Sequence, residues 1–239
     1  MKHIFSLAFF SLLVVFAAAQ KPINDPNVQL RSVNGSFHSI VVSGGIDLFI
    51  SPGSETVAVS ASNPEDRELI KTEVQNGVLK IWQDNTGGLR SFFKGGSNYR
   101  VYVSYKTLQS LKASGGCDVF SDDVIRSSSL NLSLSGGCDF TGKVDVNDLK
   151  VDQSGGTDIR ISGRAAKADI SASGGSDFKG AELVTDVANV DASGASDIDI
   201  TANKEISASA SGASDVTYRG TPQVKASHAS GAGSVRKKS

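Results

Sequence analysis

The sequence predicts an all-β protein built as a parallel β-helix, a solenoid, with a less regular β-rich part on its N-terminal side. Three observations predict it: a short motif recurs at near-constant spacing, polarity around each copy alternates with period two, and one glycine is present in every copy. Aligned columns at constant spacing favour the solenoid over the alternative, a β-sandwich of repeated hairpins. The general preference for right-handed crossovers favours a right-handed solenoid.

The motif is Ser-Gly-Gly/Ala-x-Asp. Its copies lie at residues 114–118, 135–139, 154–158, 173–177, 193–197 and 211–215, with a degenerate copy at 230–234 and an earlier one at 43–47. From 114 onward the first serines are 21, 19, 19, 20, 18 and 19 residues apart. About 60 Å of extended chain per repeat suffices for two or three short strands. One repeat cannot bury its own apolar face, so the copies are expected to stack.

Apolar residues recur at fixed offsets from each serine. Five positions after it stand Val119, Phe140, Ile159, Phe178, Ile198, Val216 and Val235. One position before it stand Ala113, Leu134, Gln153, Ala172, Ala192, Ala210 and Ala229. Gln153 breaks the second column, and we expect it at a corner or beside a polar neighbour. The glycine after each serine is expected to have a positive φ or a close backbone neighbour, and the next position accepts alanine.

Residues 1–19 predict a secretory signal peptide: a polar start, an apolar run and three alanines at 17–19. The run is shorter than the ~20 residues of a membrane-spanning helix, and no later segment is apolar enough to cross a bilayer. The protein is therefore expected to be exported, and to be periplasmic, outer-membrane associated or extracellular. We expect a linker at 20–35, the irregular β part at 36–110, the solenoid repeats at 111–235 and a basic tail at 236–239.

The irregular part shows strand patterns separated by turn signals. Strands are expected at 39–42, 46–50, 57–59, 78–82 and 100–104, with an Asn-Gly hairpin turn at 76–77 and one or two helical turns over 64–71. A glycine-rich loop at 87–98 contains Phe92 and Phe93. These rings either form an exposed contact point for a partner or fold back over the end of the sheet.

Composition excludes several classes of function. The 24 Lys and Arg residues and 25 Asp and Glu residues leave a net charge of −1, which lacks the basic field that nucleic-acid binding needs. Two cysteines cannot form a disulfide-dense scaffold or a four-cysteine zinc site. We expect no cofactor, apart from calcium as an alternative discussed below. The oligomeric state is not determined by the sequence.

The aspartate that closes each motif is the strongest candidate for a site. The column is Asp118, Asp139, Asp158, Asp177, Asp197 and Asp215. Stacked carboxylates would lie ~5 Å apart and repel one another, so solvent, hydrogen bonds or a cation must relieve the charge. A structural Asx-type turn is favoured over bound calcium. The column is an interaction ladder or a structural ladder.

Cys117 and Cys138 occupy the same offset in consecutive repeats. Stacking places their Cα atoms ~4.8 Å apart, within the range that a disulfide permits, and an oxidising compartment would allow the bond. Free buried thiols are the alternative, because side chains on adjacent parallel strands run side by side.

The chain resembles the head GIN domain family of bacterial putative auto-transporter adhesins. The resemblance covers roughly residues 30–235 and is carried by the opening motif at 40–48, the Asn-Gly hairpin within 70–81, the strand at 101–103 and the Ser-Gly-Gly-x-Asp series. It implies an exported β-helical protein with an adhesive role, and it supplies no catalytic residues.

These observations favour a non-enzymatic adhesin-like or cell-envelope interaction module that binds glycan or protein through its repeat faces. A carbohydrate-active enzyme that uses aspartates of the solenoid face is one alternative, and a purely structural envelope protein is another. Catalysis has little support, because no nucleophile motif with a triad histidine is present and the aspartates recur in every repeat.

Overall fold

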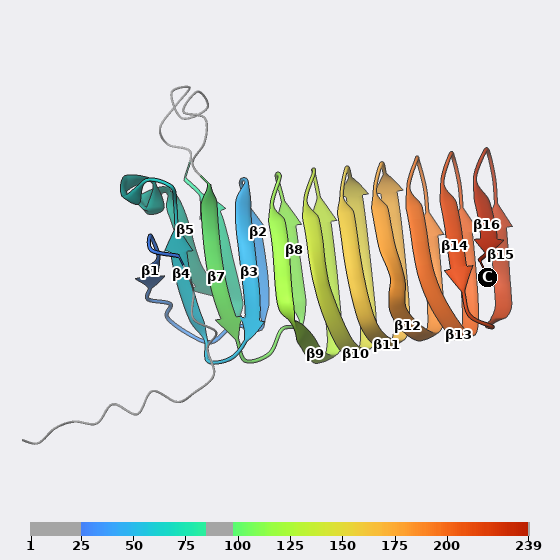
Figure 1. Cartoon of the computed structure of the whole chain (residues 1–239), viewed down its shortest axis with the longest axis horizontal. Helices are drawn as coiled ribbons and strands as arrows, with labels where there is room; N and C mark the ends of the chain where they lie inside the picture. Colours follow the sequence, from blue (N-terminus) through green and yellow to red (C-terminus); the bar gives the residue numbers. More distant parts are fainter. Residues whose placement is uncertain (1–24, 85–97, 239) are drawn as a thin grey trace, which may run out of the picture.

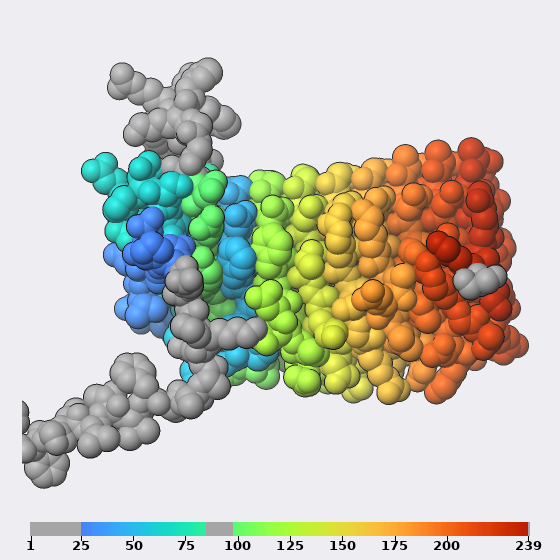
Figure 2. All heavy atoms as spheres, in the orientation of Figure 1, coloured from blue at the N-terminus to red at the C-terminus, as the bar shows by residue number. Residues whose placement is uncertain are grey.

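The computed structural model describes residues 25–84 and 98–238, which form a two-faced parallel β-solenoid (Figure 1). From residue 110 onward the coils follow one another along the long axis, so this part of the sequence runs toward one end of the molecule as successive bands of side chains (Figure 2). Fold class is as predicted: parallel strands in register and very little helix.

Each complete repeat forms one long, bent strand that passes through both sheets. These strands are β9 (Asp118–Ser135), β10 (Asp139–Gly155), β11 (Asp158–Gly174), β12 (Asp177–Ala192) and β13 (Asp197–Ala210). The first half of each strand belongs to one sheet and the second half to the other, and neighbouring strands pair in parallel along most of their length. The Ser-Gly turns connect one coil to the next along one edge of the solenoid.

The segment 36–114 contributes strands that stack in register with these repeats. Its strands are β2 (Ser39–Ser43), β3 (Ile46–Pro52), β6 (Val78–Gln83), β7 (Tyr99–Tyr105) and β8 (Ser110–Ser114). Strand β3 lies between β7 and β9, and β2 lies between β6 and β8, so spatial order differs from chain order. The early motif at 43–47 therefore stacks directly on the motif at 114–118.

Antiparallel strands and one short helix close the N-terminal end. They are β1 (Gln29–Arg31), β4 (Thr56–Ser60), β5 (Ile70–Gln75) and the 3₁₀ helix η1 (Pro64–Leu69). Strand β4 pairs with β7, and β5 forms a hairpin with β6 through Asn76 and Gly77, which both have positive φ. The hairpin and the helical turn were predicted, whereas β5 was not.

The last coil is shorter and largely exposed. It contains β14 (Asp215–Arg219), β15 (Gln223–Ala229) and β16 (Ser234–Lys237). Strand β16 pairs with β14, so Arg236 and Lys237, expected in a basic tail, are exposed residues of a strand. Ala229 ends its otherwise buried column in an exposed position, because no further coil covers it.

The predicted interior columns are confirmed. Val119, Phe140, Ile159 and Phe178 are partners on successive strands and are almost completely buried. Small side chains replace large ones in the later coils, where Ala208 and Ala210 occupy the interior. One hydrophobic cluster includes residues of the early coil and of the repeats, so both halves share a single core.

The glycine after each motif serine meets both expectations. Gly174, for example, has a φ of +82°, and a Cβ there would lie 2.9 Å from the carbonyl oxygen of Gly155 in the preceding turn. The residue that follows this glycine does not have a positive φ at Gly156 or Gly175, which explains why later copies have alanine at the same place. In the early copies, the corresponding Gly45, Gly116 and Gly137 do have a positive φ.

Differences in repeat length are absorbed at the edge opposite the turns. The coil from Asp118 to Asp139 is two residues longer than the next, and the register between β9 and β10 shifts between Thr141 and Lys143. Shifts at corresponding places accompany the coils of 20 and 18 residues. The turn edge therefore keeps its geometry while the bends vary.

Gln153 lies neither at a corner nor beside a polar partner. Its side chain is 3% exposed within the interior column, and neither amide atom has a hydrogen-bond partner. Leu134 and Ala172 are its neighbours on the adjacent strands. The expected pairing is thus wrong, and a desolvated amide remains in an apolar column.

We predict that Gly174→Ala destabilises the protein by about 1–3 kcal/mol, because alanine is strained at positive φ and its Cβ would collide with the preceding turn. Thermal unfolding followed by circular dichroism measures the change. Gly175→Ala is the matched control, since a Cβ there meets nothing closer than 3.9 Å. Equal melting temperatures for the two variants would contradict the stacking argument.

We also predict that Gln153→Leu stabilises the protein by about 1–3 kcal/mol, because it removes an unsatisfied buried amide and extends the column begun by Leu134. Denaturant unfolding measures it, with exposed Gln109→Leu as the control. A loss of stability in the Gln153 variant would show that the amide is satisfied in solution.

Candidate functional site

The motif aspartates form one column along the outer face of the first sheet. Strand pairing places Asp118, Asp139, Asp158, Asp177, Asp197 and Asp215 side by side on successive strands. Asp47 heads the column, because Leu48 and Val119 are partners and the residues before them are therefore neighbours. Sequence reasoning left Asp47 out of the ladder, although its motif copy was recognised.

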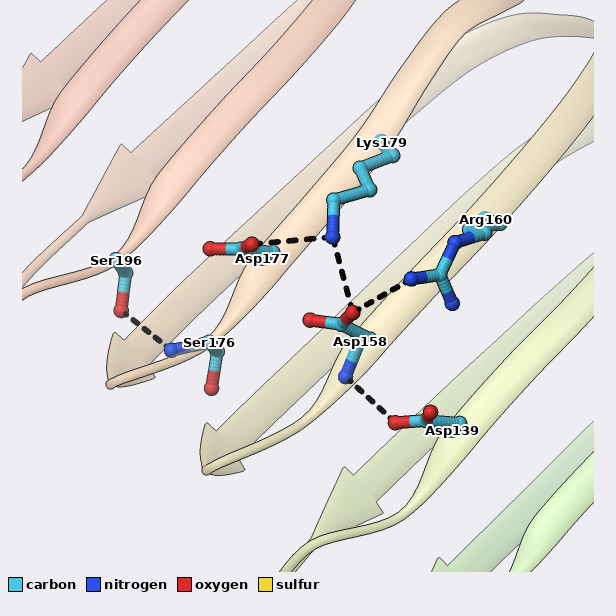
Figure 3. Close-up of polar contacts among 7 residues, drawn as sticks. All are labelled: Asp139, Asp158, Arg160, Ser176, Asp177, Lys179 and Ser196. Atoms are coloured by element: carbon cyan, nitrogen blue, oxygen red, sulfur yellow. Dashed lines mark hydrogen bonds and ion pairs between the residues drawn. The ribbon is translucent and has the colours of Figure 1, made fainter.

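Basic side chains are paired with Asp158 and Asp177 in the middle of the column (Figure 3). The Lys179 ammonium lies 2.9 Å from the Asp158 carboxylate and 3.1 Å from that of Asp177, so it bridges two coils. Arg160 lies 2.8 Å from the same Asp158 oxygen. The hydrogen bond to Asp158 and that to Asp177 raise the pKa of Lys179. The backbone N–H of Asp158 also donates to Asp139 (3.2 Å).

At its N-terminal end the column has less compensation: Arg100, the strand partner of Asp47, offsets part of that charge, but within the described residues no ion pair joins Asp118 to a basic side chain. Where Arg160 and Lys179 stand in later coils, Phe49 and Phe120 stand here, stacked with ring centroids 5.2 Å apart. Tyr102 extends the stack on the other side of Phe49, at 5.1 Å. Burial and the neighbouring carboxylate raise the pKa of Asp47 and of Asp118. Like charges therefore oppose one another at this end.

A second column, missed by sequence reasoning, points inward from the same turns. The residue before each aspartate is fully buried; the column is Ile46, Cys117, Cys138, Thr157, Ser176, Ser196 and Ser214. The Ser176 hydroxyl donates to the Ser173 carbonyl (2.8 Å), and Ser196 does so to Gly174 (3.3 Å). Some backbone N–H groups of the column donate to the side chain of the next coil: that of Ser176 bonds the Ser196 hydroxyl at 3.4 Å, and that of Ser196 bonds the Ser214 hydroxyl at 3.2 Å. These hydroxyls hold the turns together rather than facing a ligand.

Cys117 and Cys138 belong to this inward column, and both are buried free thiols. The Cys117 N–H donates to the Cys138 sulfur (3.2 Å), and the Cys117 thiol donates to the Ser114 carbonyl (3.3 Å). Hydrogen bonding between the thiols raises the pKa of Cys117 and lowers that of Cys138. The thiols thus replace the serine hydroxyls of later turns, and a disulfide between them stays a prediction.

The remaining sequence candidates have simpler outcomes. Phe92 and Phe93 lie outside the described residues. Within 25–84 and 98–238, no group of three His, Cys, Asp or Glu side chains is placed to hold a metal ion. In the same ranges, no helix has the length and apolar character of a membrane span.

The outer face of the second sheet has an open groove of about 330 Å³. Two rows of side chains border it, one beginning at Lys150 and one at Asp152, each continued on the following strands. The rows run along the solenoid axis from β10 to β15. A smaller hollow lies beside it between Asp152 and Ser154, so this face is grooved lengthwise.

The filled core, the stacked turns and the polar outer columns define a class of protein: a β-solenoid that offers repeated side chains on flat outer faces. The family described as putative auto-transporter adhesin, head GIN domain, matches residues 36–222. The chain therefore belongs to the head GIN domain family, as the resemblance had suggested.

Solved structures share the fold. A putative adhesin from Bacteroides fragilis has a TM-score of 0.79 at 18% identity, covering 88% of this chain and 96% of its own. A putative lipid binding protein from Parabacteroides distasonis has a TM-score of 0.67 at 17% identity, and the match covers 90% of this chain and 98% of its own. A putative adhesin from Parabacteroides merdae has a TM-score of 0.64 at 18% identity, and the match again covers 90% of this chain and 98% of its own. At these identities the likeness concerns the fold alone, and no curated protein was matched.

We predict that Asp118→Asn raises the melting temperature at pH 7 by about 2 °C, because it removes a repelling charge beside Asp139. A carboxyl whose pKa is higher in the folded than in the unfolded protein lowers the free energy of unfolding when the pH is above the folded-state pKa. It has no such effect when the pH is well below its ordinary pKa, because the group is then protonated in both states. The gain should therefore shrink at pH 3, where most Asp118 carboxyls are protonated in both the folded and the unfolded state.

Asp177→Asn is the control for this prediction, since it removes a partner of Lys179 rather than a repelling neighbour. It should not raise the melting temperature at pH 7. A gain at pH 3 equal to that at pH 7 for Asp118→Asn would mean that charge repulsion is not its cause.

Proposed function

We propose that the protein is an exported, non-enzymatic binding module that presents its outer faces to glycan or protein at the cell envelope. One observation carries the proposal: side chains fill the space between the sheets, while polar columns repeat in register on the outside. A ligand would therefore contact the faces rather than the interior. The adhesin description of the family supports such a role.

Export is part of the proposal and depends on the leader at 1–19. An oxidising compartment is also where a disulfide between Cys117 and Cys138 would form. The exposed basic and acidic side chains of the solenoid suit an aqueous surface, and the net charge of −1 gives no reason to expect nucleic acid as a partner.

The contacts of the aspartate column support a structural role for its C-terminal half. Asp158 and Asp177 share Lys179, and Asp158 is also paired with Arg160, which leaves these carboxylates little capacity for a ligand. The enzyme alternative would instead use Asp47 and Asp118, since a general acid needs a raised pKa.

The experiment is a glycan and matrix-protein binding screen with the purified protein, combined with an assay for release of reducing sugar. We expect saturable binding to at least one glycan or protein and no sugar release. Asp158→Ala and Asp177→Ala are expected to lower the melting temperature and to retain binding. Sugar release that Asp118→Asn abolishes would establish the enzyme alternative, and absence of any binding would favour a purely structural envelope protein.

A further inference from the structure

The groove on the second sheet combines a largely apolar lining with free hydrogen-bonding groups and a regular axial spacing. Its first row contains Lys150, Asp169, Asn189, Ser207 and Ala226, and its second row contains Asp152, Ser171, Asp191, Ser209 and His228. Neighbouring members of a row lie on adjacent strands, ~4.8 Å apart, so five strands give a groove about 19 Å long.

Small side chains create this groove. Ser171, Ser207 and Ser209 leave the backbone between the rows accessible, and Ala226 continues the shallow floor onto β15. In the early coils the corresponding outward positions hold the longer side chains of Lys80 and Lys112. The hollow therefore belongs to the late repeats, where serine and alanine replace larger residues.

Several polar groups in the groove have no partner within the described part of the chain. They are the hydroxyls of Ser171, Ser207 and Ser209, the carboxylate of Asp191 and the ring of His228. The Asp158 carboxylate on the opposite face, in contrast, has two basic partners. The second face therefore has polar groups that are available to a ligand, whereas Asp158 on the first face is already paired with side chains of the protein.

The charges of the groove exclude anionic ligands. Lys150 is paired with Asp152 at 3.0 Å, and Asp169 with Lys167 at 3.0 Å. Asp191 then remains as an uncompensated carboxylate near the centre. An anion would meet net negative charge there, whereas a carboxylate readily accepts hydrogen bonds from neutral hydroxyl groups.

The position of the groove also disfavours an extended peptide. A peptide strand binds by adding to an open sheet edge, but the strands under the groove, from β11 to β13, are paired on both sides. Extended peptides repeat at ~3.3 Å per residue, which does not match the ~4.8 Å spacing of the rows. A sugar ring in an extended polysaccharide spans about the distance between two strands and presents hydroxyls at each step.

We propose that this groove binds a neutral linear polysaccharide lying along the solenoid axis, with one sugar ring over each coil. The serine hydroxyls and Asp191 bond successive rings, and His228 closes the row at the last coil. The inference rests on the proposed binding function and names its face and ligand class.

The test is isothermal titration calorimetry with β-1,4-linked oligomers of glucose, mannose and N-acetylglucosamine, from disaccharide to hexasaccharide. For at least one series we expect affinity to rise about tenfold or more with chain length and then level off once the five strands are covered. Ser209→Trp should reduce the affinity about tenfold or more, because the indole fills the groove.

Thr141→Trp is the matched control: it adds the same ring at an exposed strand position of the first face and should change affinity less than about twofold. Unchanged circular dichroism and melting temperature show that both variants fold. Affinity that is independent of chain length, or unaffected by Ser209→Trp, overturns the groove assignment. If the broader screen then still finds a glycan or protein ligand, the proposed function stands without this site; if nothing binds in either experiment, both fail.

Discussion

The structure depends on the close stacking of one Ser-Gly turn on the next. Gly174 approaches the Gly155 carbonyl so closely that any side chain would collide with it, and its positive φ is one that other residues adopt only with strain. With the turns stacked in this way, each coil begins at the same place as its predecessor. Every later side chain then falls into a column, and differences in coil length are displaced to the bends on the opposite edge.

Stacking also determines how polar groups are accommodated inside the turns. A tight turn buries backbone groups that the sheet hydrogen bonds do not all satisfy. The inward hydroxyls of Ser176 and Ser196 bond these carbonyls, and the thiol of Cys117 does the same in an earlier coil. Gln153 shows that the same stacking can bury a polar group without a partner, because the neighbours of its amide in the column are apolar.

The two outer faces differ although one repeat generates both. On the first face, carboxylates stack at the spacing of the strands. Basic neighbours such as Lys179 compensate their charge in the middle of the column, whereas Asp118 is still repelled by the next carboxylate. On the second face, small neutral side chains alternate with paired charges, so hydroxyls remain available along a groove. Charge pairing thus gives the first face a structural role and leaves the second face available for contact.

The sequence by itself determined the solenoid, the interior columns and the need for glycine, because the motif spacing and period-two polarity are local and repeated. It also indicated the family. It could not place 43–47 between β7 and β9, since that insertion depends on long-range pairing rather than on spacing along the chain. Nor could it show that Ser176 faces inward while Asp177 is held by Lys179, because serine is polar in either position and only the stacked neighbours decide its role. The groove, too, exists only once side chains from five coils lie side by side.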